Sequence, residues 1–147
     1  MSQELVKDWM SQDVITIEVD TCCLPKAHRL MTDNHIRRLP VVDENGRLVG
    51  IVTRGDIRGA EPSQATSLSI WELNYLLANL KIADIMTPNP ITVSEDSTIG
   101  EAADLMLEHK VSGLPVTNDA GQLVGIITES DIFRMVVRHE WSQKEIA

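Results

Sequence analysis

Two pairs of short apolar runs stand out along the chain, and a cluster of turn-forming residues divides each pair. The first pair, residues 39–42 and 48–53, flanks Asp43–Gly46. The second pair flanks Asn118–Gly121. Apolar runs on either side of Asn, Asp and Gly residues are typical of a β-hairpin, because these residues adopt the backbone angles of tight turns. The pattern therefore predicts two hairpins.

Helical periodicity precedes each hairpin. The start signals are clear, since Pro25 suits the first turn of one helix and Thr98 with Glu101 makes a capping box for the other. Both helices carry an apolar face, formed by Leu24, Ala27, Leu30 and Met31 in the first and by Ile99, Ala102, Ala103, Leu105 and Met106 in the second.

Short strands and final helices complete the pattern. An apolar strand is predicted at Val14–Ile17 and another at Ile91–Val93. A last helix is predicted to begin after Thr53 and after Thr128. Each half of the chain thus reads β-α-β-β-α, and the predicted fold class is α/β (α+β). A single hairpin cannot bury both of its faces, so we expect the two halves to pack through their sheets and share a core.

The two halves are copies of one sequence. Residues 39–57 and 114–132 align at an offset of 75, and 11 of the 19 aligned pairs are identical. Upstream, the offset is 76, with Met10, Ile15, Thr16 and Asp20 matched by Met86, Ile91, Thr92 and Asp96. An internal duplication predicts that a site built by one copy is built by the other too.

The predicted domain organisation follows the repeats. Ser69 and Glu72 make a capping box at the start of a predicted helix. The apolar stripe of this helix is Ile70, Leu73, Leu76, Leu77 and Leu80. We expect the stripe to dock against the repeats, and a partner-binding helix is the alternative. The predicted segments are a first domain at 5–60, a linker with a helix at 61–79, a second domain at 80–138 and a tail at 139–147.

Composition narrows the class of protein. The net charge of −9 argues against a nucleic-acid surface and against adhesion to anionic lipid, since both need a basic face. No apolar run approaches the roughly 20 residues of a membrane span, and the first residues lack the apolar core of a secretion signal. Cys22 and Cys23 are adjacent and poorly suited to pair with each other, which favours a reducing cytoplasm.

The pattern G-h-h-T-x-x-D, where h is apolar, occurs at Gly50–Asp56 and again at Gly125–Asp131. In a structural interpretation, the Thr caps a helix and the Asp favours its positive end. In a functional interpretation, free N–H groups and the Thr hydroxyl hold a phosphate, and the carboxylate accepts the two hydrogens of a ribose diol. Both interpretations stay open, since a helix end binds an anion only while its donors are unspent.

Together with the preceding Leu-Pro-Val and the tandem β-α-β-β-α order, this motif resembles a pair of cystathionine-β-synthase (CBS) domains, known as a Bateman module. The resemblance covers residues 5–60 and 80–138. The linker SLSIWELNYLLANLKIADIMT is also similar to that of the stand-alone bacterial CBS-pair proteins of the AcuB type. The resemblance implies two CBS repeats packed through their sheets as one Bateman module, two clefts that bind adenosine-containing ligands, and a homodimer formed through helices.

The resemblance also implies roles for individual residues. Asp56 and Asp131 take the ribose-binding position, and Thr53 and Thr128 the position beside the phosphate. Pro40 and Pro115 belong to the Leu-Pro-Val segments at the same sites. An apolar slot beside a strand edge suits a purine, whose edge the backbone can read. The implied adenine-side residues are Val14, Ile15 and Thr16, and Pro90, Ile91 and Thr92.

The copies differ where charge matters. Arg37-Arg38 in the first copy correspond to Ser112-Gly113 in the second, at positions that the resemblance places on a central cavity facing the ligand phosphates. Arg54 corresponds to Glu129. Arg suits a bidentate phosphate contact, and a solvated Arg pair is the alternative. We therefore predict two clefts of unequal charge.

The expected function follows from these residues. His28, His35, His109 and His139 have no metal-ligand spacing, and no serine lies in a nucleophile elbow, so neither a metal nor a catalytic cofactor is expected. We expect a cytoplasmic regulatory module that binds AMP, ADP or ATP, forms a homodimer and acts on an unidentified effector protein, without an enzymatic activity. The alternative is a constitutive dimerisation or scaffold module with empty or vestigial clefts, and intact Thr and Asp residues in both copies count against it.

Overall fold

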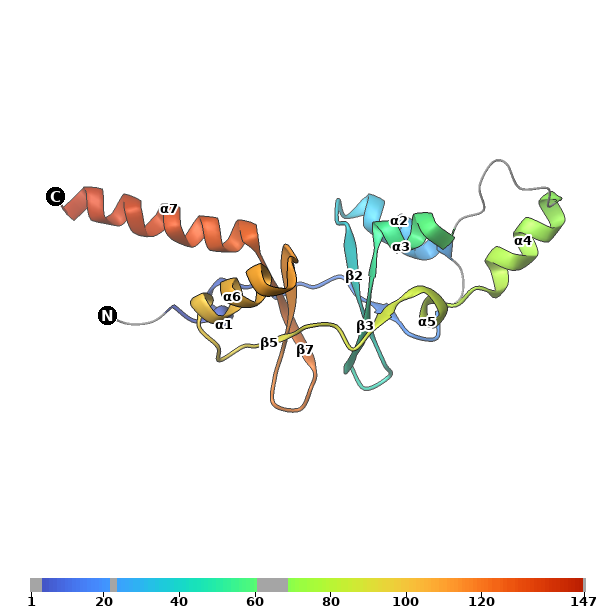
Figure 1. Cartoon of the computed structure of the whole chain (residues 1–147), viewed down its shortest axis with the longest axis horizontal. Helices are drawn as coiled ribbons and strands as arrows, with labels where there is room; N and C mark the ends of the chain where they lie inside the picture. The colour runs from blue at the N-terminus through green and yellow to red at the C-terminus, as the bar shows by residue number, and fades with distance from the viewer. Residues whose placement is uncertain (1–3, 22–23, 61–68, 147) are drawn as a thin grey trace. The chain divides into compact units, whose positions relative to one another are not determined.

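The computed structural model describes residues 4–21, 24–60 and 69–146 (Figure 1). Contacts between Cα atoms divide the chain into two compact units. The first-repeat unit is Ile15–Pro90, and the second-repeat unit is Met1–Val14 with Ile91–Ala147. Some residues named in the sequence analysis lie outside the described residues. They are Cys22, Cys23 and residues 61–68 of the linker.

The first-repeat unit contains a sheet with the strand order β1-β2-β3-β4. β1 runs parallel to β2, and the other neighbours are antiparallel. The strands are β1 (Ile17–Glu18), β2 (Arg38–Val42), β3 (Leu48–Thr53) and β4 (Thr87–Pro88). The helices are α2 (Leu24–Asp33), α3 (Arg54–Ala60), α4 (Ile70–Asn79) and α5 (Ile82–Ile85).

The second-repeat unit repeats this plan with the strand order β5-β6-β7. β5 is parallel to β6, and β6 is antiparallel to β7. The strands are β5 (Val93–Ser94), β6 (Gly113–Thr117) and β7 (Leu123–Thr128). The helices are α1 (Val6–Trp9), α6 (Ile99–His109) and α7 (Glu129–Ile146). The predicted α/β (α+β) class and the β-α-β-β-α order are confirmed in both units.

Both predicted hairpins are confirmed, and their turns close in the same way. Asp43 Oδ1 accepts two backbone N–H bonds at 2.9 and 3.0 Å. Asn118 Oδ1 accepts two at 3.0 Å in the other hairpin. Gly46 and Gly121 follow with φ of +78°, a backbone conformation that glycine adopts without steric cost.

The first strand of each repeat is shorter and later than predicted. The predicted Val14–Ile17 and Ile91–Val93 are replaced by β1 and β5, which begin at Ile17 and Val93. Each pairs with only two residues near the end of its neighbour, β1 with Val41 and Val42. Apolar spacing reports which residues are buried, but not whether a hydrogen-bonding partner lies alongside, and this explains the error.

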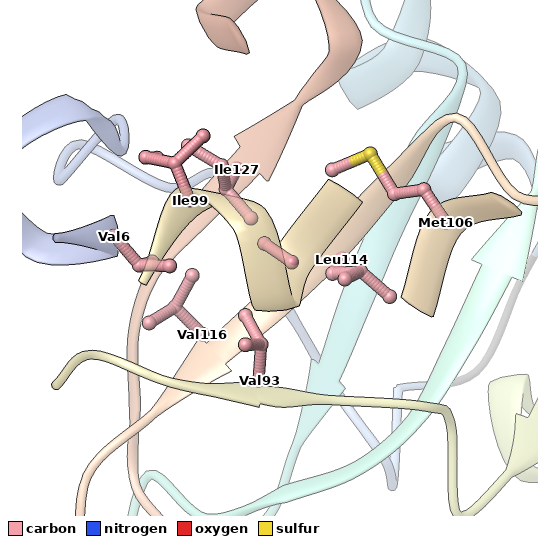
Figure 2. Close-up of a cluster of buried hydrophobic side chains, with 8 residues drawn as sticks. Val6, Val93, Ile99, Met106, Leu114, Val116 and Ile127 are labelled. Atoms are coloured by element: carbon pink, nitrogen blue, oxygen red, sulfur yellow. The ribbon is translucent and has the colours of Figure 1, made fainter. Parts of the chain in front are cut away.

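A short helix from outside each repeat completes its core. Val6 of α1 is fully buried with residues of the second repeat, including Val93 and Val116 (Figure 2). Ile82 of α5 is fully buried in the core of the first repeat. Backbone bonds hold each helix in place, from Val6 N to Ser97 O at 2.8 Å and from Ile82 N to Thr21 O at 3.0 Å. The helix that precedes one repeat in the chain is therefore packed into the other.

In each repeat, the Gly of the G-h-h-T-x-x-D motif lies against the residues that directly follow this short helix. A Cβ at Gly50 would lie against Met86 and 3.0 Å from the Thr87 carbonyl oxygen. A Cβ at Gly125 would lie against Met10 and 2.9 Å from the Ser11 carbonyl oxygen. Close backbone approach explains both glycines without any reference to a ligand.

Apolar side chains are exposed on α4. Ile70 is 72% and Leu76 50% exposed, so the expected docking of the stripe against the repeats is wrong for these two residues. Trp71 and Tyr75 are exposed as well. Helical spacing predicts a shared face, but not what covers that face. Within the described residues, no helix has the length and apolar character needed to cross a membrane.

Candidate functional site

Thr53 and Asp56 form a reciprocal pair where β3 passes into α3. The Thr53 backbone N–H donates to Asp56 Oδ2 at 2.8 Å, and the Asp56 backbone N–H donates to Thr53 Oγ1 at 3.1 Å. Thr128 N–H likewise donates to Asp131 Oδ2 at 2.8 Å. The two bonds of the first repeat are those of a capping box, and they confirm the structural interpretation of the motif there. In the second repeat the bond from the Thr128 N–H is the same, but the Thr128 hydroxyl donates to Asp131 Oδ2.

The second carboxylate oxygen distinguishes the two repeats. Arg134 Nη1 donates to Asp131 Oδ1 at 2.8 Å, and the Thr128 hydroxyl donates to Asp131 Oδ2 at 3.1 Å. Asp131 is only 5% exposed. Asp56 is half-buried, and its Oδ1 has no hydrogen bond or ion pair with any residue that the structure describes. Of the two motif aspartates, Asp56 is therefore the one with a carboxylate oxygen that no described residue occupies.

Arg37 and Arg54 meet at a pocket of about 240 Å³ in the first-repeat unit. The Arg54 backbone N–H donates to the Arg37 carbonyl at 2.8 Å, which holds the start of α3 beside the segment that leads into β2. The pocket is lined by His28, Met31, Thr32, His35, Ile36, Arg37, Arg54 and Ile57. These residues include four cationic or titratable side chains and no carboxylate. Such a lining suits an anion.

The two pocket histidines were not predicted as site residues. His28 lies on α2, and His35 follows its end with a φ of +55°. Their separation of seven residues is close to two helical turns, and both side chains line the pocket. That spacing, together with the neighbouring Arg37, was the available signal.

The matching positions of the second repeat lack this charge. At the offset of 75, His28 and Arg37 correspond to Ala103 and Ser112, and Arg54 corresponds to Glu129. His35 corresponds to Lys110, which keeps the same φ of +55°. The Glu129 backbone N–H donates to the Ser112 carbonyl at 3.0 Å, so the backbone geometry is repeated while the side-chain chemistry is not.

The remaining predicted residues of the hairpins lie inside or along the sheets. Arg38 and Gly113 stand opposite Thr53 and Thr128 in the strand register. Arg38 is half-buried and Gly113 is buried. Pro40 and Pro115 are also buried, in register with Ile51 and Ile126.

The predicted adenine-side segments lie where the chain passes between the units. Ile15, Thr16 and Pro90 belong to the same unit as Thr53 and Asp56. The residues in the unit of Thr128 and Asp131 are Val14, Ile91 and Thr92. Each predicted set is thus divided, with two of its three residues in the unit of its own motif. In the parts of the chain described, no group of three or more His, Cys, Asp or Glu residues could hold a metal ion.

Comparison with known proteins identifies the repeats. A family model for the CBS domain matches residues 6–63 and 82–138. A CBS domain-containing protein of Dictyostelium discoideum is 39% identical over 134 residues, which are 91% of this chain and 92% of that protein. The resemblance to paired CBS domains is confirmed.

Solved structures give the same result. The CBS domain pair of protein MJ0100, in complex with 5′-methylthioadenosine and S-adenosyl-L-methionine, is 35% identical with a TM-score of 0.73, over 94% of this chain and 99% of that one. CBSX2, from Arabidopsis thaliana, in complex with AMP is 29% identical with a TM-score of 0.77, over 93% and 98%. A protein of Vibrio cholerae provisionally assigned to acetoin utilization (AcuB) is 29% identical with a TM-score of 0.79, over 98% of each chain.

Some relatives are enzymes, and the match covers a small part of them. L-aspartate semialdehyde sulfurtransferase of Methanocaldococcus jannaschii is 37% identical over 132 residues, which are 89% of this chain and 23% of that enzyme. The likeness to this enzyme therefore lies in a CBS pair, the part that the Dictyostelium and Vibrio proteins also share with this chain.

Proposed function

The chain belongs to the CBS domain family, and we propose that it is a regulatory module that binds an adenine nucleotide (AMP, ADP or ATP) in its first repeat. The observation that carries the proposal is the Asp56 carboxylate. Its Oδ2 accepts the Thr53 N–H at 2.8 Å, whereas Oδ1 is open to a ligand. A ribose offers two adjacent hydroxyl groups, and each can donate to a carboxylate oxygen.

Charge beside Asp56 favours a nucleotide phosphate. Arg54 and Ile57, which stand two residues before and one residue after Asp56, both line the pocket that Arg37 also lines. A guanidinium binds phosphate oxygens through two parallel N–H bonds. A ribose on Asp56 would thus have its 5′ substituent near two cations. This arrangement favours AMP, ADP or ATP over an adenosine compound whose tail carries a positive charge.

The structural relatives support the broader ligand class. MJ0100 was solved with 5′-methylthioadenosine and S-adenosyl-L-methionine, and CBSX2 with AMP. Adenosine is the part that these ligands share. The adenine-side roles of Val14, Ile15 and Thr16, and of Pro90, Ile91 and Thr92, remain predictions from the family resemblance.

The second repeat favours the alternative of a site without ligand. Arg134 already occupies Asp131 Oδ1, and Glu129 places a negative charge where the first repeat has Arg54. A ribose would have to displace a 2.8 Å ion pair at a carboxylate that is 5% exposed. We therefore assign the tight site to the first repeat and a weak or empty site to the second.

Regulation would follow from linkage. A ligand shifts a protein between two states only as far as its affinities for those states differ. The homodimer and the effector protein expected from the resemblance are part of this proposal. The exposed Trp71 and Tyr75 of α4 are available for contact with another chain.

Calorimetric titration with AMP, ADP, ATP, S-adenosylmethionine and NAD tests the proposal on the wild type, Asp56→Asn and Asp131→Asn. Asn keeps an oxygen that can accept the capping N–H, so the helix start is preserved while the charge is removed. We expect Asp56→Asn to weaken nucleotide binding about tenfold or more, as for lost hydrogen bonds to a charged group. Asp131→Asn is the matched control and should have little effect.

The outcomes separate the hypotheses. Nucleotide binding that is unchanged in Asp56→Asn would contradict the ribose assignment. Binding of none of the five compounds would favour the constitutive scaffold. Tighter binding of S-adenosylmethionine than of any phosphate-bearing nucleotide would keep the adenosine class and contradict the nucleotide assignment.

A further inference from the structure

We propose that the pocket between α2 and α3 of the first repeat is a phosphate site whose affinity rises as the pH falls, because His28 and His35 line it beside Arg37 and Arg54. The proposal rests on the proposed function, in that the phosphates would be those of the bound nucleotide. It adds a second input, the proton concentration, to the same site.

The size of the pocket fits a part of a nucleotide and not the whole. Its volume of about 240 Å³ is below the roughly 300 Å³ at which pockets begin to enclose a drug-sized ligand. Asp56 lies next to this pocket in α3 but does not line it. A ribose on Asp56 and a phosphate group in the pocket are therefore compatible, since each occupies its own place.

The charged groups around the pocket come from three elements. α2 contributes His28, and its end contributes His35; the segment before β2 contributes Arg37, and α3 contributes Arg54. The other charged residues of α2 and α3 are not among the lining residues. The carboxylates among them are Asp33 and Asp56, and the cations are Lys26, Arg29 and Arg58. Within the described residues, no carboxylate competes with an anion inside the pocket.

Histidine is the side chain whose charge changes between about pH 5 and pH 8. A phosphate dianion in the pocket favours the imidazolium form of a histidine that faces it. Binding and protonation therefore strengthen each other, and the coupling is reciprocal. A guanidinium keeps its charge throughout this range, so the affinity that persists at high pH comes from Arg37 and Arg54.

The second repeat offers no such response. Ala103 replaces His28, Lys110 replaces His35 and Ser112 replaces Arg37. None of these three residues is a histidine, the side chain whose charge changes near neutral pH. The proton response is therefore a property of the first repeat alone.

The experiment measures the affinities of ATP, adenosine and inorganic tripolyphosphate at about pH 6 and about pH 8. We expect ATP and tripolyphosphate to bind about threefold to tenfold more tightly at the lower pH, the range for two exposed charge pairs. Adenosine, which has no phosphate, should bind equally at both. The ligand itself cannot produce this result, because protonation of a terminal phosphate below about pH 6 lowers its charge and acts in the opposite direction.

The double variant His28→Gln/His35→Gln should abolish the difference between the two pH values and retain binding at the higher one. His109→Gln, the same change on α6 of the second repeat, is the control and should keep the difference.

A pH response that persists in the double variant overturns the proposal. Binding of ATP by the wild type that does not depend on pH also overturns it, but leaves the nucleotide function standing. Tripolyphosphate binding that depends on pH, without nucleotide binding, would support the pocket and overturn the nucleotide function. Binding of neither would overturn both.

Discussion

Arg134 Nη1 lies 2.8 Å from Asp131 Oδ1, and this ion pair has no counterpart in the first repeat, where Gly59 stands at the position of Arg134. Each side chain three residues after the motif Asp lies on the same helix face one turn on. An Arg at this position binds the second carboxylate oxygen of the Asp, and a Gly leaves that oxygen available to a ligand. The two copies of the motif thus differ in a residue that lies three positions after the motif.

Gly59→Arg should close the first repeat in the same way. A Cβ at Gly59 meets no atom within 4 Å, so the longer side chain can be accommodated. We expect nucleotide affinity to fall about tenfold, the effect of a competing charged hydrogen bond on Asp56. Calorimetric titration with ATP measures the loss, and Gly59→Ala, which adds no charge, is the control. Equal affinity in all three proteins would show that the carboxylate does not bind the ligand.

Arg134→Gln should open the second repeat. Asp131 then loses its cation while its bonds from Thr128 remain, so a weak second binding event should become detectable. Because Arg134 is 57% exposed, we expect a cost in the free energy of unfolding of only about 1 kcal/mol. The number of nucleotides bound per chain, measured by equilibrium dialysis at high ligand concentration, is the readout. An unchanged number in a folded variant would mean that Glu129, and not Arg134, keeps this site empty.

Gly50→Ala and Gly125→Ala should each destabilise the protein. The new Cβ would meet a backbone carbonyl, of Thr87 in one case and of Ser11 in the other, and backbone atoms cannot move aside as a flexible side chain can. We expect a loss of about 1–3 kcal/mol in the free energy of unfolding, typical of overpacking. Urea denaturation measures the loss, and Gly59→Ala, in open space, is the matched control. A loss no greater than in Gly59→Ala would contradict the close approach.

The sequence predicted those features that depend on neighbouring residues. The hairpins follow from Asn, Asp and Gly at the turns, and the helix starts follow from Thr53 and Thr128, because each is a local pattern. The packing of α1 and α5, each into the repeat that it does not precede in the chain, could not be predicted in this way. Each has only four residues, too few for a periodic pattern, and its partner lies far away in the sequence.

The candidate site was predictable to a similar degree. Asp56 and Arg54 follow from the motif, and Arg37 from its place before Leu-Pro-Val. The Asp131–Arg134 pair could also have been predicted, since three-residue spacing on a helix brings opposite charges together. The contribution of His28 and His35 depends on the packing of α2 against α3, which the spacing on one helix does not specify.

Ile82→Ala should destabilise the first repeat and Val6→Ala the second, although each lies outside the repeat it affects. Both side chains are fully buried, and Ile→Ala in a core costs about 2–5 kcal/mol in the free energy of unfolding. Hydrogen exchange measured by mass spectrometry locates the effect, which we expect in β2 and β3 for Ile82→Ala and in β6 and β7 for Val6→Ala. Faster hydrogen exchange in β6 and β7 for Ile82→Ala, or in β2 and β3 for Val6→Ala, would contradict this packing.

The cluster of Glu4, Trp9 and His139 should make the second-repeat unit sensitive to acid. The Trp9 indole N–H donates to Glu4 Oε2 at 2.7 Å, and His139 Nε2 lies 2.7 Å from Glu4 Oε1. The indole bond, with a further contribution from His139, holds the pKa of Glu4 below its ordinary value of 4.5. Because this pKa is lower in the folded protein than in the unfolded chain, the cluster stabilises the fold fully above 4.5 and loses its effect as the pH falls through the folded value.

Glu4→Gln should therefore lower the thermal unfolding midpoint at neutral pH, and its difference from the wild type should shrink as the pH falls below the ordinary pKa of Glu4. Glu108→Gln, an exposed carboxylate on α6 of the same unit, is the control and should follow the wild type over the whole range. Thermal denaturation of the three proteins between about pH 3 and pH 7 measures the effect across the range in which a carboxylate titrates. A difference that stays constant with pH would show that Glu4 acts through packing and not through its charge.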